Sequence, residues 1–216
     1  MSRNKGKGLL FSGLLLIAAA CFLIAYNLHE EQRAGETVEQ VLQSVPNKIR
    51  CTQSPQKKMP VTEKTDRMLP DYMLNPYMDM PIENIGGIAY IGILRIPALE
   101  WELPVISQWS YANLKSAPCR YKGSAYLDTL ILCGHNYRSH FGKLKKLREG
   151  DEVSFTDMDG NVFLYEVALV ETLMPTAIEE MESGGWALTM FTCTIGGASR
   201  VTVRCDRMEE PEGKAK

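Results

Sequence analysis

Three side chains in the second half of the sequence carry the groups that a cysteine enzyme needs: a thiol, an imidazole and a guanidinium. His135 directly follows an apolar segment that ends in Gly134, and Cys193 ends the segment Leu188-Thr-Met-Phe-Thr-Cys193. Arg200 opens the next β-like segment after a glycine-rich loop. A thiolate is a nucleophile, an imidazole beside it can transfer a proton, and a cation can stabilise the thiolate or a developing oxyanion. Strand ends are where a rigid scaffold presents such groups to a cleft.

Each of these residues also has an ordinary structural explanation. A lone cysteine is more often a small buried residue than a nucleophile, and His135 would serve equally well as a cap for a following helix. His140 comes five residues after His135, so the two would lie on different faces of a helix, and His29 has no partner in view. The sequence has no Cys-x-x-Cys or His-x-x-x-His pair. We therefore predict no metal site and no cofactor.

The elements that must position these groups are predicted to be mainly β-strands. Short segments rich in β-branched and aromatic residues, separated by turn signals, favour a closed β-barrel or a sandwich. Seven or eight short strands are predicted in about 120 residues, over 88–96, 103–106, 130–133, 152–156, 162–170, 186–192 and 200–206. Helical turns are expected at 111–115 and within 175–185. Phe141, Leu144 and Leu147 predict a short amphipathic helix over 139–148.

Several of these segments together resemble the sortases, the cysteine transpeptidases of Gram-positive cell surfaces. The resemblance covers roughly residues 87–207, with the motifs in the order of the family. Its motifs are the opening strands Ile93-Leu-Arg-Ile-Pro97 and Leu103-Pro-Val105, Gly134-His135, the segment 141–151, and Leu188-Thr-x-x-Thr-Cys193 followed seven residues later by Arg200. The implied fold is a closed seven- to eight-stranded sortase-type barrel with short helices, in which the strands of Cys193 and Arg200 lie side by side.

The resemblance also implies a mechanism and partners. Cys193 would attack the carbonyl of a sorting motif near the C-terminus of a surface protein and form an acyl-enzyme. His135 would protonate the leaving amine and deprotonate the incoming one, and Arg200 would position the peptide or stabilise the oxyanion. The amine acceptor would be a peptidoglycan precursor or a pilin lysine, and no nucleic acid is expected.

The class of sortase stays open, because features of two classes are mixed. Gly134-His135-Asn136 resembles class B, whereas Thr192-Cys193-Thr194 resembles the pilin-polymerising class C. Asn75-Pro76-Tyr77 is similar to the Asp-Pro-aromatic lid of class C, but Asn replaces Asp and an ordinary turn is the preferred interpretation. Glu179, Glu180 and Glu182 are interpreted as a solvated acidic run rather than a calcium site.

The N-terminus predicts a membrane anchor. Residues 9–26 form an uncharged run of 18 residues, which as a helix would span roughly 27 Å. Arg3, Lys5 and Lys7 precede it without an acid, so the positive-inside rule places residues 1–8 in the cytoplasm and the rest outside. A cleaved signal peptide with a site near Ala18-Ala19-Ala20, or a lipoprotein signal at Cys21, would also export the chain. No second apolar run is found, so one span is predicted.

Composition supports this division of the 216 residues. At 45% hydrophobic and 23% charged the chain is not disordered, and a net charge of −2 argues against a nucleic-acid binder. A membrane-proximal helix or solvated stalk and a Pro- and Met-rich linker are predicted over 27–86, and a polar tail over 208–216. The part 68–80 is too apolar for a free linker, so we expect it to pack on another part of the protein. Six cysteines are too few for a disulfide scaffold. Cys51, Cys119, Cys133 and Cys205 would allow two disulfides in three connectivities, although buried or free thiols are preferred.

Two other functions compete with the transpeptidase. A cell-wall cysteine peptidase would pass the acyl group to water, but papain-like enzymes place the cysteine before the histidine, whereas here His135 precedes Cys193. A non-catalytic barrel that only binds peptides is the other alternative. The joint presence of Cys193, His135 and Arg200 argues against it without excluding an inactive relative.

Overall fold

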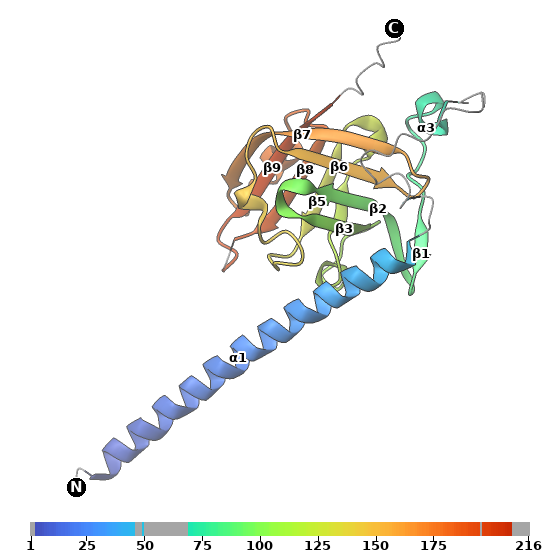
Figure 1. Ribbon diagram of the computed structural model, residues 1–216. Coiled ribbons are helices and arrows are strands. Elements are labelled where there is room, and N and C mark those ends of the chain that lie inside the picture. Colours follow the sequence, from blue (N-terminus) through green and yellow to red (C-terminus); the bar gives the residue numbers. More distant parts are fainter. Residues whose placement is uncertain (1–2, 46–48, 50–68, 195, 209–216) are drawn as a thin grey trace.

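The computed structural model describes residues 3–45, 49, 69–194 and 196–208. Nine strands form one sheet that rolls into a barrel, and a long N-terminal helix leaves the barrel along one side (Figure 1). The strands are β1 Glu83–Ile85, β2 Ile88–Ile96, β3 Trp101–Ile106, β4 Cys119–Lys122, β5 Leu130–Gly134, β6 Glu152–Asp157, β7 Val162–Leu173, β8 Leu188–Cys193 and β9 Arg200–Arg207. The helix α1 spans Arg3–Ser44.

The barrel closes through a pairing between β2 and β6, which are far apart in the sequence. The strand order is β1-β2-β3-β4-β5-β8-β9-β7-β6, and β2 also pairs antiparallel with β6. Strands β2 to β9 therefore make a ring of eight, and β1 extends one edge of β2. The predicted closed barrel of seven to eight strands is confirmed.

Alternate residues of the strands fill the interior of the barrel. Leu132 of β5, Met190 of β8 and Val203 of β9 belong to one buried cluster and are each 0% exposed. Phe155 and Phe163 from the β6–β7 hairpin fill the same space. This interior is the main source of stability, since each fully buried large side chain contributes roughly 1.5–3 kcal/mol.

A second buried cluster lies outside the barrel, where α1 packs on it. Val41 of α1 and Val45, the residue after the end of that helix, lie there with Ile93 of β2, Ile106 of β3 and Cys133 of β5. The odd and even positions of the same strands thus serve two different cores, one inside the ring and one beneath the helix.

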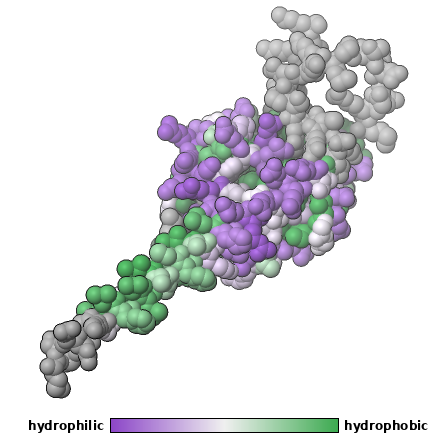
Figure 2. All heavy atoms as spheres, turned by 60° about the horizontal axis from the view of Figure 1, so that its bottom comes forward, coloured by the Kyte–Doolittle hydropathy of each residue, from purple (hydrophilic) through white to green (hydrophobic). Residues whose placement is uncertain are grey.

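The helix α1 is one continuous element and is longer than predicted. The sequence suggested an apolar span followed by a separate short helix or a stalk, but the structure joins them without a break. Its first part projects from the barrel as an apolar rod (Figure 2), with Leu9 79% and Leu28 57% exposed. The first buried residue is Ala34, and Val38 and Val41 continue the same helical face.

The helix predicted over 139–148 is wrong. The segment consists of turns and a short 3-10 helix, Leu144–Lys146. Its backbone N–H groups bond three residues back, as from Leu144 to Phe141 and from Leu147 to Leu144. A spacing of three is the period of a 3-10 helix, so these three residues are still buried together.

The other short elements are close to their predicted places or were missed. A 3-10 turn lies within the predicted turn at 111–115, and a short helix lies within 175–185. The strands β1 and β4 and two 3-10 turns were not predicted from the sequence. The short elements are α3 Asp71–Leu74, η1 Pro97–Leu99, η2 Asn113–Lys115, η3 Ala125–Leu127 and α4 Ile178–Glu182.

The segment after the linker packs on the barrel, as predicted for its described part. The Tyr72 ring stacks on Tyr126 at 4.7 Å between centroids, and Met80 is 3% exposed. Asn75 ends α3, where Met78 donates a backbone hydrogen bond back to it, and Tyr77 is 84% exposed. This geometry agrees with an ordinary turn. Most of the linker, including Cys51, lies outside the described residues.

Candidate active site

The strand register brings the ends that carry the three candidate residues together. Strand β5 runs parallel to β8 with Gly134 opposite Thr192, so His135 and Cys193 are the next residues along adjoining strands. Strand β9 runs antiparallel to β8, and Cys193 pairs directly with Arg200. Cross-strand partners present their side chains on the same face of a sheet. The predicted side-by-side arrangement of the Cys193 and Arg200 strands is therefore present.

Two buried contacts hold the end of β5 in place. The Thr192 hydroxyl, 3% exposed, donates to the Gly134 carbonyl at 2.8 Å. A Cβ at Gly134 would lie 2.7 Å from the buried Phe141 ring, which leaves room only for glycine. The Gly-His pair is thus explained by close packing: the glycine lets Phe141 close the barrel beside the strand end, and His135 follows directly.

His135 lies in a partly buried aromatic environment. Its ring stacks on Tyr137 at 4.8 Å between centroids, and Tyr137 contacts His140 at 5.4 Å. Burial lowers the pKa of His135, and the positive charge of Lys115 lowers it further. The neutral imidazole is therefore favoured at neutral pH, and it can accept a proton.

His140 is the buried histidine behind this stack. It is 0% exposed, and burial, with the nearby His135, lowers its pKa to about 4. The Ser116 backbone lies close enough to the His140 ring to raise its pKa slightly and so offsets part of the shift. It does not form a full hydrogen bond, since neither ring nitrogen has a partner among the described residues. His140 is thus held as a neutral ring beside the site.

Cys193 differs from the other thiols of the barrel in its accessibility. Cys119, Cys133 and Cys205 are buried free thiols, and Cys193 is half-buried. Burial raises the pKa of Cys119 to about 12 and raises the pKa values of Cys133 and Cys205 as well, so these three stay protonated and unreactive. The preference for buried free thiols is met by these three residues.

The loop between Cys193 and Arg200 is tightly hydrogen-bonded. The Thr194 hydroxyl accepts from the Ser199 backbone N–H at 3.1 Å, and Gly197 donates its N–H to the Thr194 carbonyl at 2.8 Å. The Arg200 guanidinium donates to the carbonyls of Gly197 and Ser199, each at 3.3 Å. Within the described chain it has no carboxylate partner, so its charge is not neutralised.

A row of aromatic rings leads away from the site across the outer face of the barrel. Phe191, on the face of β8 that carries Cys193, contacts Tyr121 edge-on at 5.4 Å, and Tyr121 contacts Trp109 at 6.0 Å. Beside them is a cavity of about 450 Å³ lined by Ser107, Gln108, Trp109, Arg120, Tyr121, Lys122 and Gly123. Trp101 belongs to the core and is 7% exposed, whereas Trp109 lines this cavity and is 43% exposed.

The segment between β7 and β8 is attached to the same outer face by a buried arginine. Arg204 is 2% exposed and donates to the Met181 carbonyl at 2.6 Å, the Glu180 carbonyl at 2.8 Å and the Glu171 carboxylate at 2.9 Å. Glu182 from this segment pairs with Lys122, which lines the cavity. Sequence reasoning gave Arg204 no structural role and missed Tyr121 and Lys115. The alternation of β9 places Arg204 on the same face as Arg200 and was the available signal.

The acidic run shows no arrangement for a metal. Glu179 and Glu180 are exposed, as predicted, and only Glu182 has an ion-pair partner. Within the described residues no group of three or more His, Cys, Asp or Glu side chains is placed to hold a metal ion.

The closed barrel brings a thiol, an imidazole and a guanidinium to adjoining strand ends. This arrangement is typical of a cysteine enzyme. A family model described as the sortase domain matches residues 94–208, and the chain belongs to the sortase family. Sortase A of Bacillus anthracis is 29% identical over 109 residues, which is 48% of this chain and 51% of that protein. The chain thus aligns with about half the length of this curated relative.

Solved structures of streptococcal sortases share the fold. The sortase C1 structure from Streptococcus suis is 26% identical, with a TM-score of 0.50 over 58% of this chain and 76% of that chain. A sortase C2 of pilus island 1 from group B Streptococcus is 21% identical, with a TM-score of 0.52 over 60% of this chain and 77% of that chain. The second likeness concerns the fold alone.

Proposed function

We propose that this chain is a membrane-anchored, extracellular cysteine transpeptidase that joins surface proteins to an amine of the cell wall or of a pilin. The observation that carries the proposal is the strand register, with Gly134 opposite Thr192 and Cys193 opposite Arg200. Membership of the sortase family supports the reaction class.

In the first half-reaction, the Cys193 sulfur attacks the carbonyl carbon of a peptide bond in the sorting motif. His135, whose lowered pKa favours the neutral base, takes the thiol proton. The tetrahedral intermediate then expels the C-terminal part as an amine, which receives that proton from His135, and a thioester remains on Cys193. Arg200 stabilises the negative oxygen or holds the peptide, and its charge is free for either role.

In the second half-reaction, an amine attacks the thioester carbonyl. His135 removes a proton from that amine and returns it to the departing Cys193 sulfur. One amide bond is broken and one is formed, so the net reaction needs no oxidant, metal or nucleotide.

The anchor is the second part of the proposal. Helix α1 has one window apolar enough to cross a membrane, and none of that window is buried in the structure. The basic residues before it favour a cytoplasmic N-terminus, with the barrel outside. This placement brings the reaction centre to the surface where membrane-linked substrates and acceptors are found.

The test uses the full chain in detergent or vesicles with a library of sorting-motif peptides and a small amine, read by mass spectrometry. We expect an amine adduct and a thioester on Cys193, both absent in Cys193→Ala and retained in Cys21→Ala, which removes a thiol in the apolar helix. Hydrolysis that no amine redirects would favour a peptidase. Absence of turnover and of thioester on every peptide would contradict an enzyme of either kind.

A further inference from the structure

A cluster of basic side chains follows His135 directly in the sequence. Five of the twelve Lys and Arg residues between positions 87 and 207 fall within eleven residues, against no acid in that stretch. They are Arg138, Lys143, Lys145, Lys146 and Arg148, which we call the basic segment. Four of them are exposed and Lys143 is half-buried. None has an ion-pair partner in the described part of the chain.

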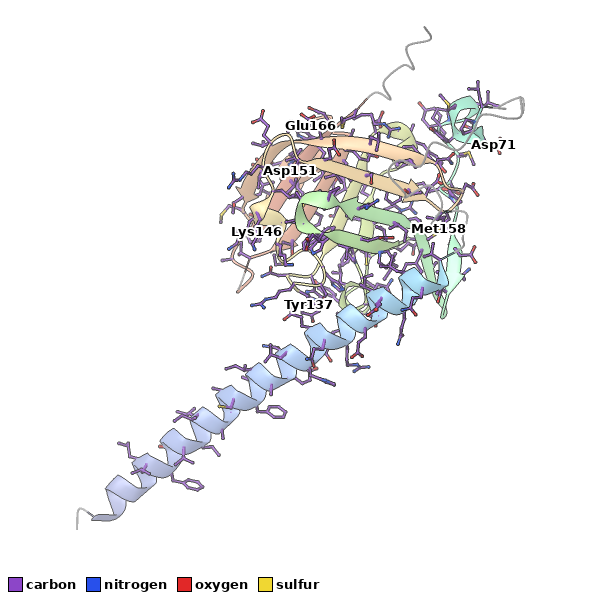
Figure 3. The ribbon with its side chains drawn as sticks, in the orientation of Figure 1. Asp71, Tyr137, Lys146, Asp151, Met158 and Glu166 are labelled. Atoms are coloured by element: carbon purple, nitrogen blue, oxygen red, sulfur yellow. The ribbon has the colours of Figure 1, made fainter. Side chains whose placement is uncertain are left out.

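The local fold displays these cations together. Leu144 and Leu147 point into the barrel and are 0% and 4% exposed, so the lysines between and beside them face outward. Figure 3 places Tyr137 and Lys146 on the flank of the barrel that is turned toward the N-terminal half of α1, while Met158 and Asp71 lie at the other end. The basic segment therefore faces the direction from which the apolar rod emerges.

The height of the basic segment above the rod is fixed by a direct contact. The Glu31 carboxylate on α1 accepts a hydrogen bond from the Arg138 backbone N–H at 2.7 Å. Glu31 comes five residues after Tyr26, the end of the apolar run, and the helix between them is unbroken. Five helical residues rise roughly 7.5 Å, and the headgroup layer of a bilayer is about 5–8 Å thick on each side. Arg138 is thus held at the level of the lipid headgroups.

We propose that the basic segment binds the phosphate headgroups of an anionic lipid bilayer and so holds the barrel against the membrane with its catalytic edge at the surface. The inference depends on the proposed anchoring by α1. Lipid is the expected partner rather than a soluble or wall polyanion, because Arg138, where the basic segment begins, lies beside the span at the level of its headgroup layer. Each cation near an anionic surface favours docking by about fivefold, and the effect fades over a Debye length of roughly 8 Å.

This docking would restrict the orientation of the reaction centre. A single helix with no further contact leaves the barrel free to tilt with it, since spans commonly tilt by about 20°. The basic segment begins three residues after His135, so binding of lipid there holds the histidine edge near the plane of the membrane. His135 and Cys193 would then stay at a fixed distance from the membrane, within reach of a membrane-embedded acceptor.

The test measures lysine accessibility in the full chain reconstituted in vesicles. Vesicles of phosphatidylcholine alone are compared with vesicles that also contain phosphatidylglycerol, and a membrane-impermeant acetylating reagent reports each lysine by mass spectrometry. Lys122, which lines the cavity beside Trp109 and Tyr121, is the internal reference. We expect Lys145 and Lys146 to be protected several-fold on the anionic vesicles only, and high salt to remove the protection.

A charge-matched pair of variants separates docking from the general effect of a negative surface. Lys145→Gln/Lys146→Gln removes two cations of the basic segment. Asn84→Asp/Arg207→Gln changes the net charge by the same amount at positions outside that segment. Lys143 is the readout in both. We expect its protection on anionic vesicles to be lost in the first variant, which weakens docking roughly 25-fold, and kept in the second.

The outcomes distinguish this inference from the anchor. If the chain floats with neutral vesicles in high salt but anionic lipid changes no lysine, the anchor stands and the inference is overturned. Failure to float with neutral vesicles would contradict the anchor itself and, with it, the height argument. Equal protection by soluble polyphosphate on neutral vesicles, at the same phosphate concentration, would make the segment a general polyanion site and overturn the choice of lipid.

Discussion

The two faces of strand β8 differ in what their residues do. Leu188, Met190 and Thr192 face the interior and are buried, whereas Phe191 and Cys193 face outward and are half-buried. The inward residues contribute packing, and the outward ones meet aromatic rings, the Arg200 strand and solvent. Because side chains alternate along a strand, one six-residue segment can stabilise the barrel with one face and present Cys193, the proposed nucleophile, on the other.

Substituting one residue on each face of β8 should give the largest difference between an effect on turnover and an effect on stability. Cys193→Ala should abolish thioester formation and turnover, while the free energy of unfolding changes little because the side chain is half-buried and loses few contacts. Met190→Ala should cost about 2–5 kcal/mol of stability through the cavity it leaves, with turnover kept by the molecules that remain folded. Urea unfolding and mass-spectrometric turnover on both variants make the comparison. Comparable losses of stability in the two would contradict the separation of the faces.

The outer face also contains a structural network, which the next variant isolates. Arg204→Ala would leave the carbonyls of Glu180 and Met181 and the Glu171 carboxylate without their donor. We expect a loss of about 3 kcal/mol in urea unfolding, because these groups are buried or partly buried. Arg33→Ala is the matched control: its ion pair with Glu30 spans 3.9 Å and its side chain is 68% exposed, so its loss should cost less than about 1 kcal/mol. Equal effects would show that burial is not what makes Arg204 different.

The strands were predicted more accurately from the sequence than the contacts between distant segments. The strand 88–96 matches β2, and 200–206 matches β9 within one residue, because long runs of β-branched residues between turn signals are distinctive. The four-residue β4 has too short a pattern to recognise. The spacing of Phe141, Leu144 and Leu147 fits both an α-helix and a 3-10 helix, and the burial of all three hides the difference.

The arrangement around the candidate site was only partly predictable. His135, Cys193 and Arg200 were singled out from their positions at the ends of apolar segments. The environment of His135 was not, because Lys115 approaches it, and α1 approaches the neighbouring Tyr137 and Arg138, only through tertiary contacts that no local pattern encodes. The β2–β6 closure and the Glu31–Arg138 hydrogen bond likewise join residues more than 50 positions apart.

The buried histidine predicts a loss of stability in acid. The pKa of His140 is about 4 in the folded chain, against 6.5 for an unperturbed histidine, so the unfolded chain binds the proton more tightly. The contribution of the neutral His140 to the free energy of unfolding is therefore complete above pH 6.5. It is lost as the pH falls toward 4, by up to roughly 3 kcal/mol. His140→Phe should reduce this acid loss in thermal unfolding between pH 7 and about 4. His29→Gln, at an exposed site on α1, should leave it unchanged, and an unaltered profile in His140→Phe would assign the loss to other groups.

The smallest expected effect concerns the charge of Lys115 near His135, the proposed proton-transfer residue. Lys115 is one of the two causes that lower the pKa of His135, after burial, and its own side chain is 56% exposed and 3.8 Å from Glu30. Lys115→Gln should therefore raise the pKa of His135 by only part of the total shift, and added salt should shrink the difference because the charge is screened. An NMR titration of the His135 ring measures this directly and does not depend on turnover. Lys122→Gln removes a lysine that does not perturb His135, so it should leave the titration unchanged. If Lys115→Gln also has no effect, burial alone lowers the pKa of His135. The outer face would then act on this histidine as the interior of the barrel acts on a buried group, by excluding water.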